Sequence, residues 1–182
     1  VKDWKISYIG LGKLGLPCAE VCAEKGYDVT GYDVARKHSD LIKIKASMED
    51  AVVDRDIIFV AVPTPHEEGY DGREPTSHKE VKDFDYDTVK QVLTKLNDIC
   101  SRDQIVVLIS TVLPGTCRRE FSDLCLKIGL VYNPYLIAMG TVKWDMANPE
   151  MIMIGTEEGS TSNESAWLSK FYEPMLEQKT RI

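Results

Sequence analysis

The chain has 182 residues, of which 43% are hydrophobic and 28% are charged, and its formal net charge is −7. This length and apolar content suffice for one domain with a buried core, residues 1–182, and not for two large domains. The acidic balance disfavours binding to nucleic acid, and no apolar run approaches the roughly 18 residues that span a membrane.

The five cysteines have neither the number nor the spacing of a disulfide framework, and they contain no CxxC pair. Residues 1–4 are not followed by the apolar stretch of a signal peptide. We therefore expect reduced thiols in a cytoplasmic protein. No metal site is expected either, because His66, Glu67, Glu68 and Asp71 lie in a polar stretch where nothing fixes their geometry.

Short apolar runs alternate with helical patterns along the chain. In chain order, we expect strands at 5–9 and 28–32 around a helix at 14–25, and small elements around 35–44 and 47–53. A strand at 57–62, a long loop at 66–85, a helix at 86–99 and a strand at 105–109 follow. The remaining elements are a helix within 113–126 that follows Pro114-Gly115, short strands at 130–132 and 151–154, and a helix at 165–176. Such alternation predicts a parallel sheet with helices on both faces.

The turn between the first strand and the first helix has the pattern GxGxxG. It comprises Gly10, Leu11, Gly12, Lys13, Leu14 and Gly15. Gly10 permits the tight turn, Gly12 lets the backbone approach a pyrophosphate, and Gly15 lets helix and strand pack closely. The helix N-terminus offers free N–H groups to the phosphates. The pattern predicts an α/β fold of the Rossmann type, a doubly wound and mostly parallel sheet that binds a dinucleotide. A glycine-rich turn without a ligand is the alternative.

Asp33 ends the second strand, where a carboxylate can accept hydrogen bonds from the adenosine ribose. The same charge repels a 2′-phosphate, by roughly 4 kcal/mol per unit charge at ~4 Å and an effective dielectric constant of ~20. Arg36 and Lys37 follow closely and could offset part of this repulsion. The sequence therefore favours NAD over NADP.

Two further motifs follow later strands. VPTP comprises Val62, Pro63, Thr64 and Pro65, and STVLPGT spans residues 110–116. Together with GLGKLGLP at 10–17, the NP pair at 133–134 and the segment 148–156, they resemble the NAD-binding N-terminal domain of the UDP-glucose/GDP-mannose 6-dehydrogenase family. The resemblance covers most of the chain from Trp4 onward.

This resemblance implies roles for the motifs. Family members oxidise the C6 alcohol of a nucleotide sugar to the acid with two NAD. Val62, Pro63, Thr64 and Pro65 would line the adenosine side of the cofactor. Ser110 and Thr111 would lie by the nicotinamide ribose, and Thr111, as the candidate catalytic residue, would face the reacting carbon. A nucleotide sugar would be a partner only together with a further domain.

The chain also departs from the family pattern. Tyr135 and Met139 stand where the family carries two glutamates, and neither side chain supplies a carboxylate. The family's nucleophilic cysteine, lysine and aspartate belong to a later segment, and no cysteine here lies in a matching motif. Cys18 and Cys22 fall on the presumed buried side of the first helix. The stretch between the second and third strands is shorter than is usual, so one side of the adenine pocket is expected to be reduced.

Three interpretations remain, and they leave open whether the chain is an enzyme. In the first interpretation, the chain is the cofactor half of a nucleotide-sugar dehydrogenase and is inactive as an isolated chain. In the second, it is a stand-alone dinucleotide-binding protein with a sensing or partner-binding role. In the third, it belongs to a different Rossmann dehydrogenase, of the 3-hydroxyisobutyrate or 6-phosphogluconate type. The missing acids favour the second interpretation, and VPTP and STVLPGT argue against the third.

Overall fold

The computed structural model describes residues 3–178 and 180–182. Six parallel strands form one sheet in the order β3-β2-β1-β4-β5-β6. The strands are β1 (Lys5–Ile9), β2 (Asp28–Tyr32), β3 (Lys43–Ile44), β4 (Ile57–Val60), β5 (Ile105–Leu108) and β6 (Gly129–Tyr132). The sheet grows outward from β1 in one direction and from β4 in the other, which is the doubly wound arrangement with its switch point between these strands. The predicted fold class is confirmed.

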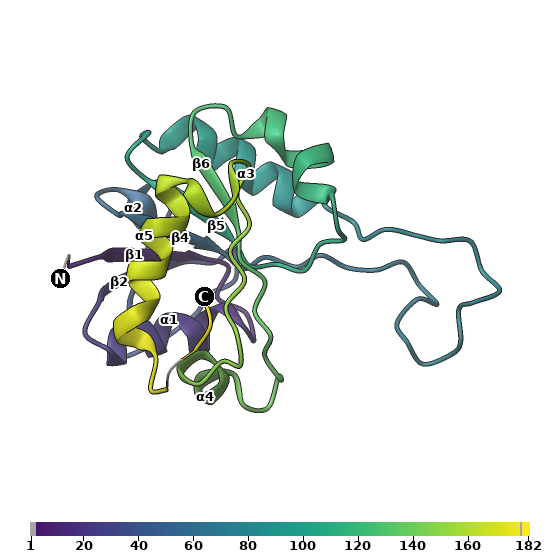
Figure 1. Cartoon of the computed structure of the whole chain (residues 1–182), viewed down its shortest axis with the longest axis horizontal. Helices are drawn as coiled ribbons and strands as arrows, with labels where there is room; N and C mark the ends of the chain where they lie inside the picture. The colour runs from purple at the N-terminus through teal and green to yellow at the C-terminus, as the bar shows by residue number, and fades with distance from the viewer. Residues whose placement is uncertain (1–2, 179) are drawn as a thin grey trace.

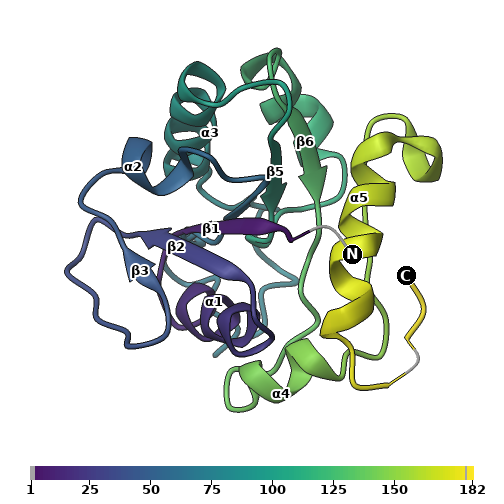
Figure 2. The same ribbon diagram turned by 90° about the vertical axis from the view of Figure 1, so that its left-hand side faces the viewer.

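Helices cover both faces of the sheet (Figure 2). On one face lie α1 (Gly15–Glu24), α4 (Val142–Ala147) and α5 (Asn163–Tyr172), and on the other lie α2 (Met48–Val52) and α3 (Asp87–Ile99). Helix α3 buries Val89, Val92, Leu93 and Leu96, as their helical spacing predicts. Every residue of β4 and β5 is buried, because helices cover both sides of these central strands.

The helix predicted after Pro114-Gly115, within 113–126, lies where it was expected but is irregular. It consists of a five-residue π-helical turn, η1 (Cys117–Phe121), followed by a 3₁₀ turn, η2 (Ser122–Leu124). Gly115, whose φ of +84° is left-handed, comes before these helical turns. The Ser122 hydroxyl then donates to the carbonyl oxygens of Cys117 and Arg118, at 3.3 and 3.0 Å, and so competes with regular backbone pairing.

The predicted strand at 151–154 is wrong. Only two isolated bridges form there, between Met151 and Arg181 and between Gly155 and Tyr132. The Asn133 side chain donates to the carbonyl oxygen of Met153 at 2.7 Å, so a side chain occupies an acceptor that a ladder would have used.

Other elements differ less from expectation. Strand β3 and helix α2 fall within the small elements expected after the second strand, and the last helix ends as α5 plus a 3₁₀ turn, η4 (Glu173–Met175). Helix α4 was not expected, although buried Val142 and Met146 stand one helical turn apart. Among the described residues, no helix is long and apolar enough to cross a membrane.

The long loop predicted at 66–85 is confirmed as an arm that leaves the carboxyl edge of the sheet and projects away from the domain (Figure 1). The amide of Asp85 donates to the carbonyl oxygen of Pro65 at 2.8 Å, which joins the two ends of the arm at its root. Further out, the Tyr70 hydroxyl donates to the Glu80 carbonyl oxygen at 2.7 Å. The arm therefore has internal bonds although it stands apart from the core.

Candidate functional site: the carboxyl edge of the sheet

The glycines of the turn after β1 differ in what surrounds them. A Cβ added to Gly10, whose φ is +93°, would lie 2.5 Å from the carbonyl oxygen of Ala61, and one added to Gly15 would overlap the carbonyl oxygen of Gly10. A Cβ added to Gly12 would meet nothing within 4 Å. Gly10 and Gly15 are thus required by packing, whereas the space over Gly12 is open to a ligand.

Asp33 is bonded to the same turn. Its Oδ2 accepts a hydrogen bond from the amide of Leu11 at 2.7 Å, and its Oδ1 accepts one from the amide of Ala35, also at 2.7 Å. Leu11 itself is buried. The carboxylate therefore ties the end of β2 to the glycine-rich turn and lies half-buried beside it.

The segments after β4 and β5 meet at the neighbouring part of this edge. The buried Ser110 hydroxyl donates to the carbonyl oxygen of Val62 at 2.7 Å. Thr111 follows with its side chain exposed. Next along the chain, the amide of Val112 donates to the Tyr132 hydroxyl at 3.4 Å. Ser110 is thus occupied in joining two loops, while Thr111 stays available to a ligand.

All the residues predicted for the cofactor site lie at this carboxyl edge, because each follows a parallel strand. They differ in exposure. Buried are Leu11, Gly15 and Ser110; half-buried are Gly10, Leu14, Asp33, Val62 and Thr64; exposed are Gly12, Lys13, Pro63, Pro65 and Thr111. The exposed members are accessible to a ligand, and the buried ones hold the loops in place.

Tyr135, at a position where the family carries an acid, joins a buried cluster of hydroxyl groups. The Tyr172 hydroxyl donates to Asn133 Oδ1 at 2.5 Å and lies 3.0 Å from the Tyr135 hydroxyl. The Tyr8 hydroxyl lies 3.5 Å from that of Tyr135. Burial raises the pKa of Tyr8, Tyr135 and Tyr172 well above the usual tyrosine value. The cluster is neutral at physiological pH and supplies no general base.

The five cysteines are all free thiols. Cys18 and Cys22 are buried, as predicted, and burial raises the pKa of Cys22 to about 12. Cys117 and Cys125 line a groove of about 600 Å³ beside β6, but burial raises the pKa of these thiols to about 11 and about 12. Because the thiolate is the nucleophile, neither is an activated nucleophile.

No group of three or more metal-ligating side chains in the described part of the chain could hold a metal ion. In the segment after β6, Met139 is exposed, and Lys143 forms ion pairs with Glu20 and Glu24, each at 2.9 Å. Tyr86, Tyr132, Tyr172 and Asn133 hold the loops of this edge. Of these four, only Asn133 belongs to a sequence motif, the NP pair, and the motif does not reveal its bonds because their partners are distant in the chain.

A glycine-rich turn between β1 and α1, an acid at the end of β2 and ligand-facing loops after β4 and β5 define a dinucleotide-binding domain of the oxidoreductase type. The open space over Gly12, next to the N-terminus of α1, fits a pyrophosphate. The residues present therefore suit this class of cofactor.

Comparison with known proteins gives the family. The model of the UDP-glucose/GDP-mannose dehydrogenase family, NAD binding domain, matches residues 35–176. The chain belongs to this family, it is the family's NAD-binding domain, and its cofactor is NAD. The alternative of a 3-hydroxyisobutyrate or 6-phosphogluconate dehydrogenase is thereby set aside. The glycine-rich turn and Asp33 precede the matched range.

Individual relatives extend the similarity to the whole chain. The UDP-N-acetyl-D-mannosamine dehydrogenase of Methanococcus maripaludis is 26% identical over 98% of this chain and 44% of its own length. The UDP-glucose 6-dehydrogenase of Rickettsia prowazekii is 25% identical, over 97% of this chain and 44% of its own. A GDP-mannose dehydrogenase of Pseudomonas aeruginosa, solved as a ternary complex, has the same fold, with a TM-score of 0.76, 22% identity, and coverage of 97% of this chain and 46% of that one. The chain spans less than half the length of these relatives.

Proposed function

We propose that the chain binds NAD along the carboxyl edge, with the pyrophosphate over Gly12 and the adenosine ribose on Asp33. The observation that carries this proposal is the open space over Gly12 between two glycines that packing requires. Lys13 and Leu14 complete the turn, and Leu11 holds it through its bond to Asp33. The free N–H groups of the α1 N-terminus face the phosphates.

The loops after β4 and β5 take the rest of the cofactor in this proposal. Val62, Pro63, Thr64 and Pro65 line the adenosine side. Ser110 lies by the nicotinamide ribose, and its bond to the Val62 carbonyl joins the two loops. Thr111, exposed at the end of β5, faces the nicotinamide and the reacting carbon.

Asp33 sets the preference for NAD over NADP. A 2′-phosphate on the adenosine ribose would meet this carboxylate, and Arg36 and Lys37, which follow it, offset only part of the repulsion. The Asp33→Ser variant should narrow the difference in Kd between NAD and NADP. A wild-type chain that prefers NADP in parallel titrations would contradict the assignment.

Calorimetric titration with NAD tests the pyrophosphate position. The Gly12→Val variant should weaken binding at least 100-fold, because the isopropyl group fills the space of the pyrophosphate. Gly140→Val is the matched control, since Gly140 also has open space at its Cβ and lies outside the turn. It should bind NAD as the wild type does. Equal binding by wild type and Gly12→Val would overturn the proposal.

For the substrate side, we propose that a nucleotide sugar binds only together with a further domain, and that the isolated chain does not turn it over. Tyr135 and Met139 supply no carboxylate, and the thiols whose pKa values burial raises supply no nucleophile. The five free cysteines also support a cytoplasmic location.

A second candidate function is a stand-alone NAD-binding protein with a sensing or partner-binding role. It is favoured by Tyr135, whose hydroxyl is engaged inside the domain with Tyr172 rather than offered to a substrate. To distinguish the two candidates, the substrate-binding segment of a relative is produced separately and mixed with this chain, NAD and a nucleotide sugar, and the formation of NADH is measured. Restored turnover supports the first function, and NAD binding without turnover supports the second.

A further inference from the structure

The loop after β5, residues 110–116, is held by hydroxyl groups from separate elements; we call it the β5 loop. Two consecutive amides of its backbone are bonded to tyrosines. The amide of Val112 donates to the Tyr132 hydroxyl at 3.4 Å, and the amide of Leu113 donates to the Tyr86 hydroxyl at 3.1 Å. Thr111 lies next to these held amides and is exposed. The position of Thr111 therefore depends on where the two tyrosine hydroxyls lie.

Tyr86 can hold the β5 loop because Asp83 fixes the direction of its hydroxyl. The ring of Tyr86 is buried at the start of α3, and its hydroxyl donates to Asp83 Oδ1 at 2.5 Å. A tyrosine hydroxyl has one proton to donate, so the bond to Asp83 turns the oxygen lone pairs toward the Leu113 amide. The Tyr86 hydroxyl also lowers the pKa of Asp83 below its usual value, so the carboxylate stays charged at neutral pH.

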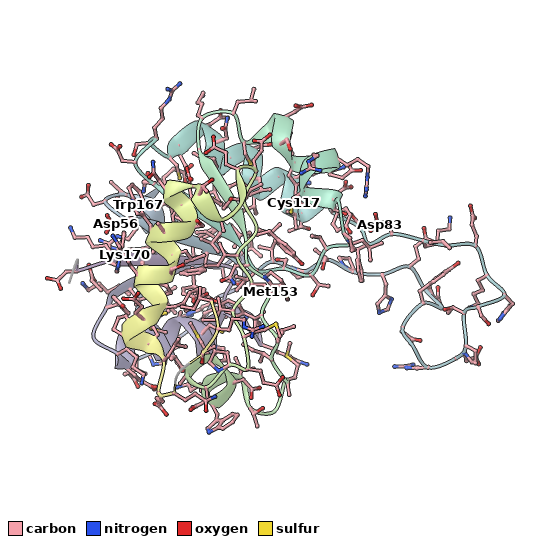
Figure 3. The ribbon with its side chains drawn as sticks, in the orientation of Figure 1. Asp56, Asp83, Cys117, Met153, Trp167 and Lys170 are labelled. Atoms are coloured by element: carbon pink, nitrogen blue, oxygen red, sulfur yellow. The ribbon has the colours of Figure 1, made fainter. Side chains whose placement is uncertain are left out.

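Asp83 is itself held by Arg119 of η1, which follows the β5 loop. Arg119 Nη2 lies 3.0 Å from Asp83 Oδ2 and 3.2 Å from the hydroxyl of Thr116, a fully buried residue. Figure 3 shows Asp83 at the root of the arm, where the arm leaves the body of the domain. Two paths of hydrogen bonds thus run from Asp83 at the arm root to the β5 loop. One passes through Tyr86 to the Leu113 amide, and the other passes through Arg119 to the Thr116 hydroxyl, so that together they close a ring of hydrogen bonds.

We infer that Asp83 and Tyr86 are positioning residues for the nicotinamide half of NAD. Their hydrogen bonds reach the backbone of the β5 loop and not Thr111 itself, so they act by setting the position of this loop. The glycine-rich turn and Asp33 have their own bonds, so the pyrophosphate and the adenosine ribose do not depend on this ring of hydrogen bonds. The inference rests on the proposed function, because it requires NAD to lie along the carboxyl edge with its nicotinamide by Thr111.

The test compares NAD with ADP-ribose, which is the same molecule without the nicotinamide. Tyr86→Phe removes the hydroxyl and keeps the ring. Its Kd for NAD should rise about 3- to 10-fold, the range expected for one hydrogen bond, while its Kd for ADP-ribose stays within about 2-fold. Asp83 is more exposed, so the Asp83→Asn variant should raise the Kd for NAD by a smaller factor. Its Kd for ADP-ribose should also stay within about 2-fold of the wild-type value.

Tyr70→Phe is the matched control, because the tyrosine hydroxyl that it removes is bonded to the Glu80 carbonyl oxygen within the arm, which projects away from the domain (Figure 1). It should leave both constants unchanged. Thermal unfolding of each variant checks that the domain still folds. If the Tyr86→Phe variant does not fold, the Asp83→Asn variant provides the test.

Four results would overturn the inference. The first is an unchanged Kd for NAD in both variants, and the second is an equal weakening of NAD and ADP-ribose, which indicates a general packing defect. The third is equal affinity of the wild type for the two ligands, since the β5 loop would then hold no nicotinamide. A wild type that binds neither ligand would overturn the proposed function and, with it, this inference.

Discussion

Two regions of the carboxyl edge are built in different ways. In the centre, the turn after β1 is held by backbone contacts: glycines where a Cβ would collide, and an Asp33 carboxylate on a backbone amide. At one end, the segment after β6 is held by side chains, with Asn133 bonded to Tyr172 and to the Met153 carbonyl. Figure 1 shows both regions at the same edge of one sheet.

This difference separates cofactor binding from chemistry. Backbone N–H groups and an open space recognise a pyrophosphate whatever the neighbouring side chains are. Proton and hydride transfer to a sugar need particular side chains at particular places. The turn after β1 retains the open space and the backbone N–H groups that pyrophosphate binding requires. In the segment after β6, Tyr135 is engaged in the neutral hydroxyl cluster where the family carries an acid.

The largest effect is expected where the backbone is most crowded. Gly15→Ala places a methyl group on the carbonyl oxygen of Gly10, so the turn must open, at a cost of about 3 kcal/mol in the free energy of unfolding. Gly12→Ala is the matched control and should cost less than about 1 kcal/mol, because nothing lies near its Cβ. Urea unfolding measures both. Similar losses in the two variants would show that the turn is not held by close packing.

A smaller effect is expected in the side-chain network. Asn133→Ala leaves the Tyr172 hydroxyl and the Met153 carbonyl without this buried partner, and should cost about 2–3 kcal/mol. Asn148→Ala removes an amide that bonds at a more exposed site and should cost less than about 1 kcal/mol. If Asn133→Ala unfolds at the wild-type urea concentration, the network does not stabilise the segment after β6.

The smallest effect is expected at the opposite edge of the sheet. Hydrogen bonds from Lys43 and Arg55 lower the pKa of Asp28 to about 2 from its ordinary 3.8. A depressed carboxyl pKa stabilises the fold above the unfolded-state pKa, and this contribution is lost as the pH falls from near 4 through about 2. Because Asp28 is partly exposed, Asp28→Asn should cost only about 0.5–1 kcal/mol at pH 7. The difference from wild type should vanish near pH 2, and a constant difference across pH 2–7 would contradict the ion-pair account.

The same contrast explains how much the sequence predicted. Strands β1 and β2 have the predicted bounds, and the glycine-rich turn lies where its pattern indicated, because local backbone chemistry determines both. The predicted strand at 151–154 failed because the Asn133 side chain, distant in the sequence, takes the Met153 carbonyl. The helix predicted within 113–126 forms irregular turns, because Ser122 competes for backbone carbonyls. Apolar spacing in a single sequence reports neither event.

Likewise, the motifs located the cofactor residues but not the groups that hold them. Asp83 and Tyr86 are three residues apart, but Arg119 meets them only because the arm returns to the body beside the β5 loop. Nothing in their spacing marks this meeting, since the contacts depend on tertiary structure.

The account is tested most directly by absorbance at the NADH band when the isolated chain is mixed with NAD and an excess of UDP-glucose, a UDP-N-acetyl sugar or GDP-mannose. It predicts that calorimetry detects NAD binding while no steady NADH production occurs, since positioning alone is worth roughly 7–11 kcal/mol of a barrier. In addition, Tyr135 and Met139 supply no carboxylate, and burial raises the pKa of the Cys117 and Cys125 thiols. Steady NADH production that disappears in the Thr111→Ala variant would contradict the account, because a complete active site would then exist in this chain.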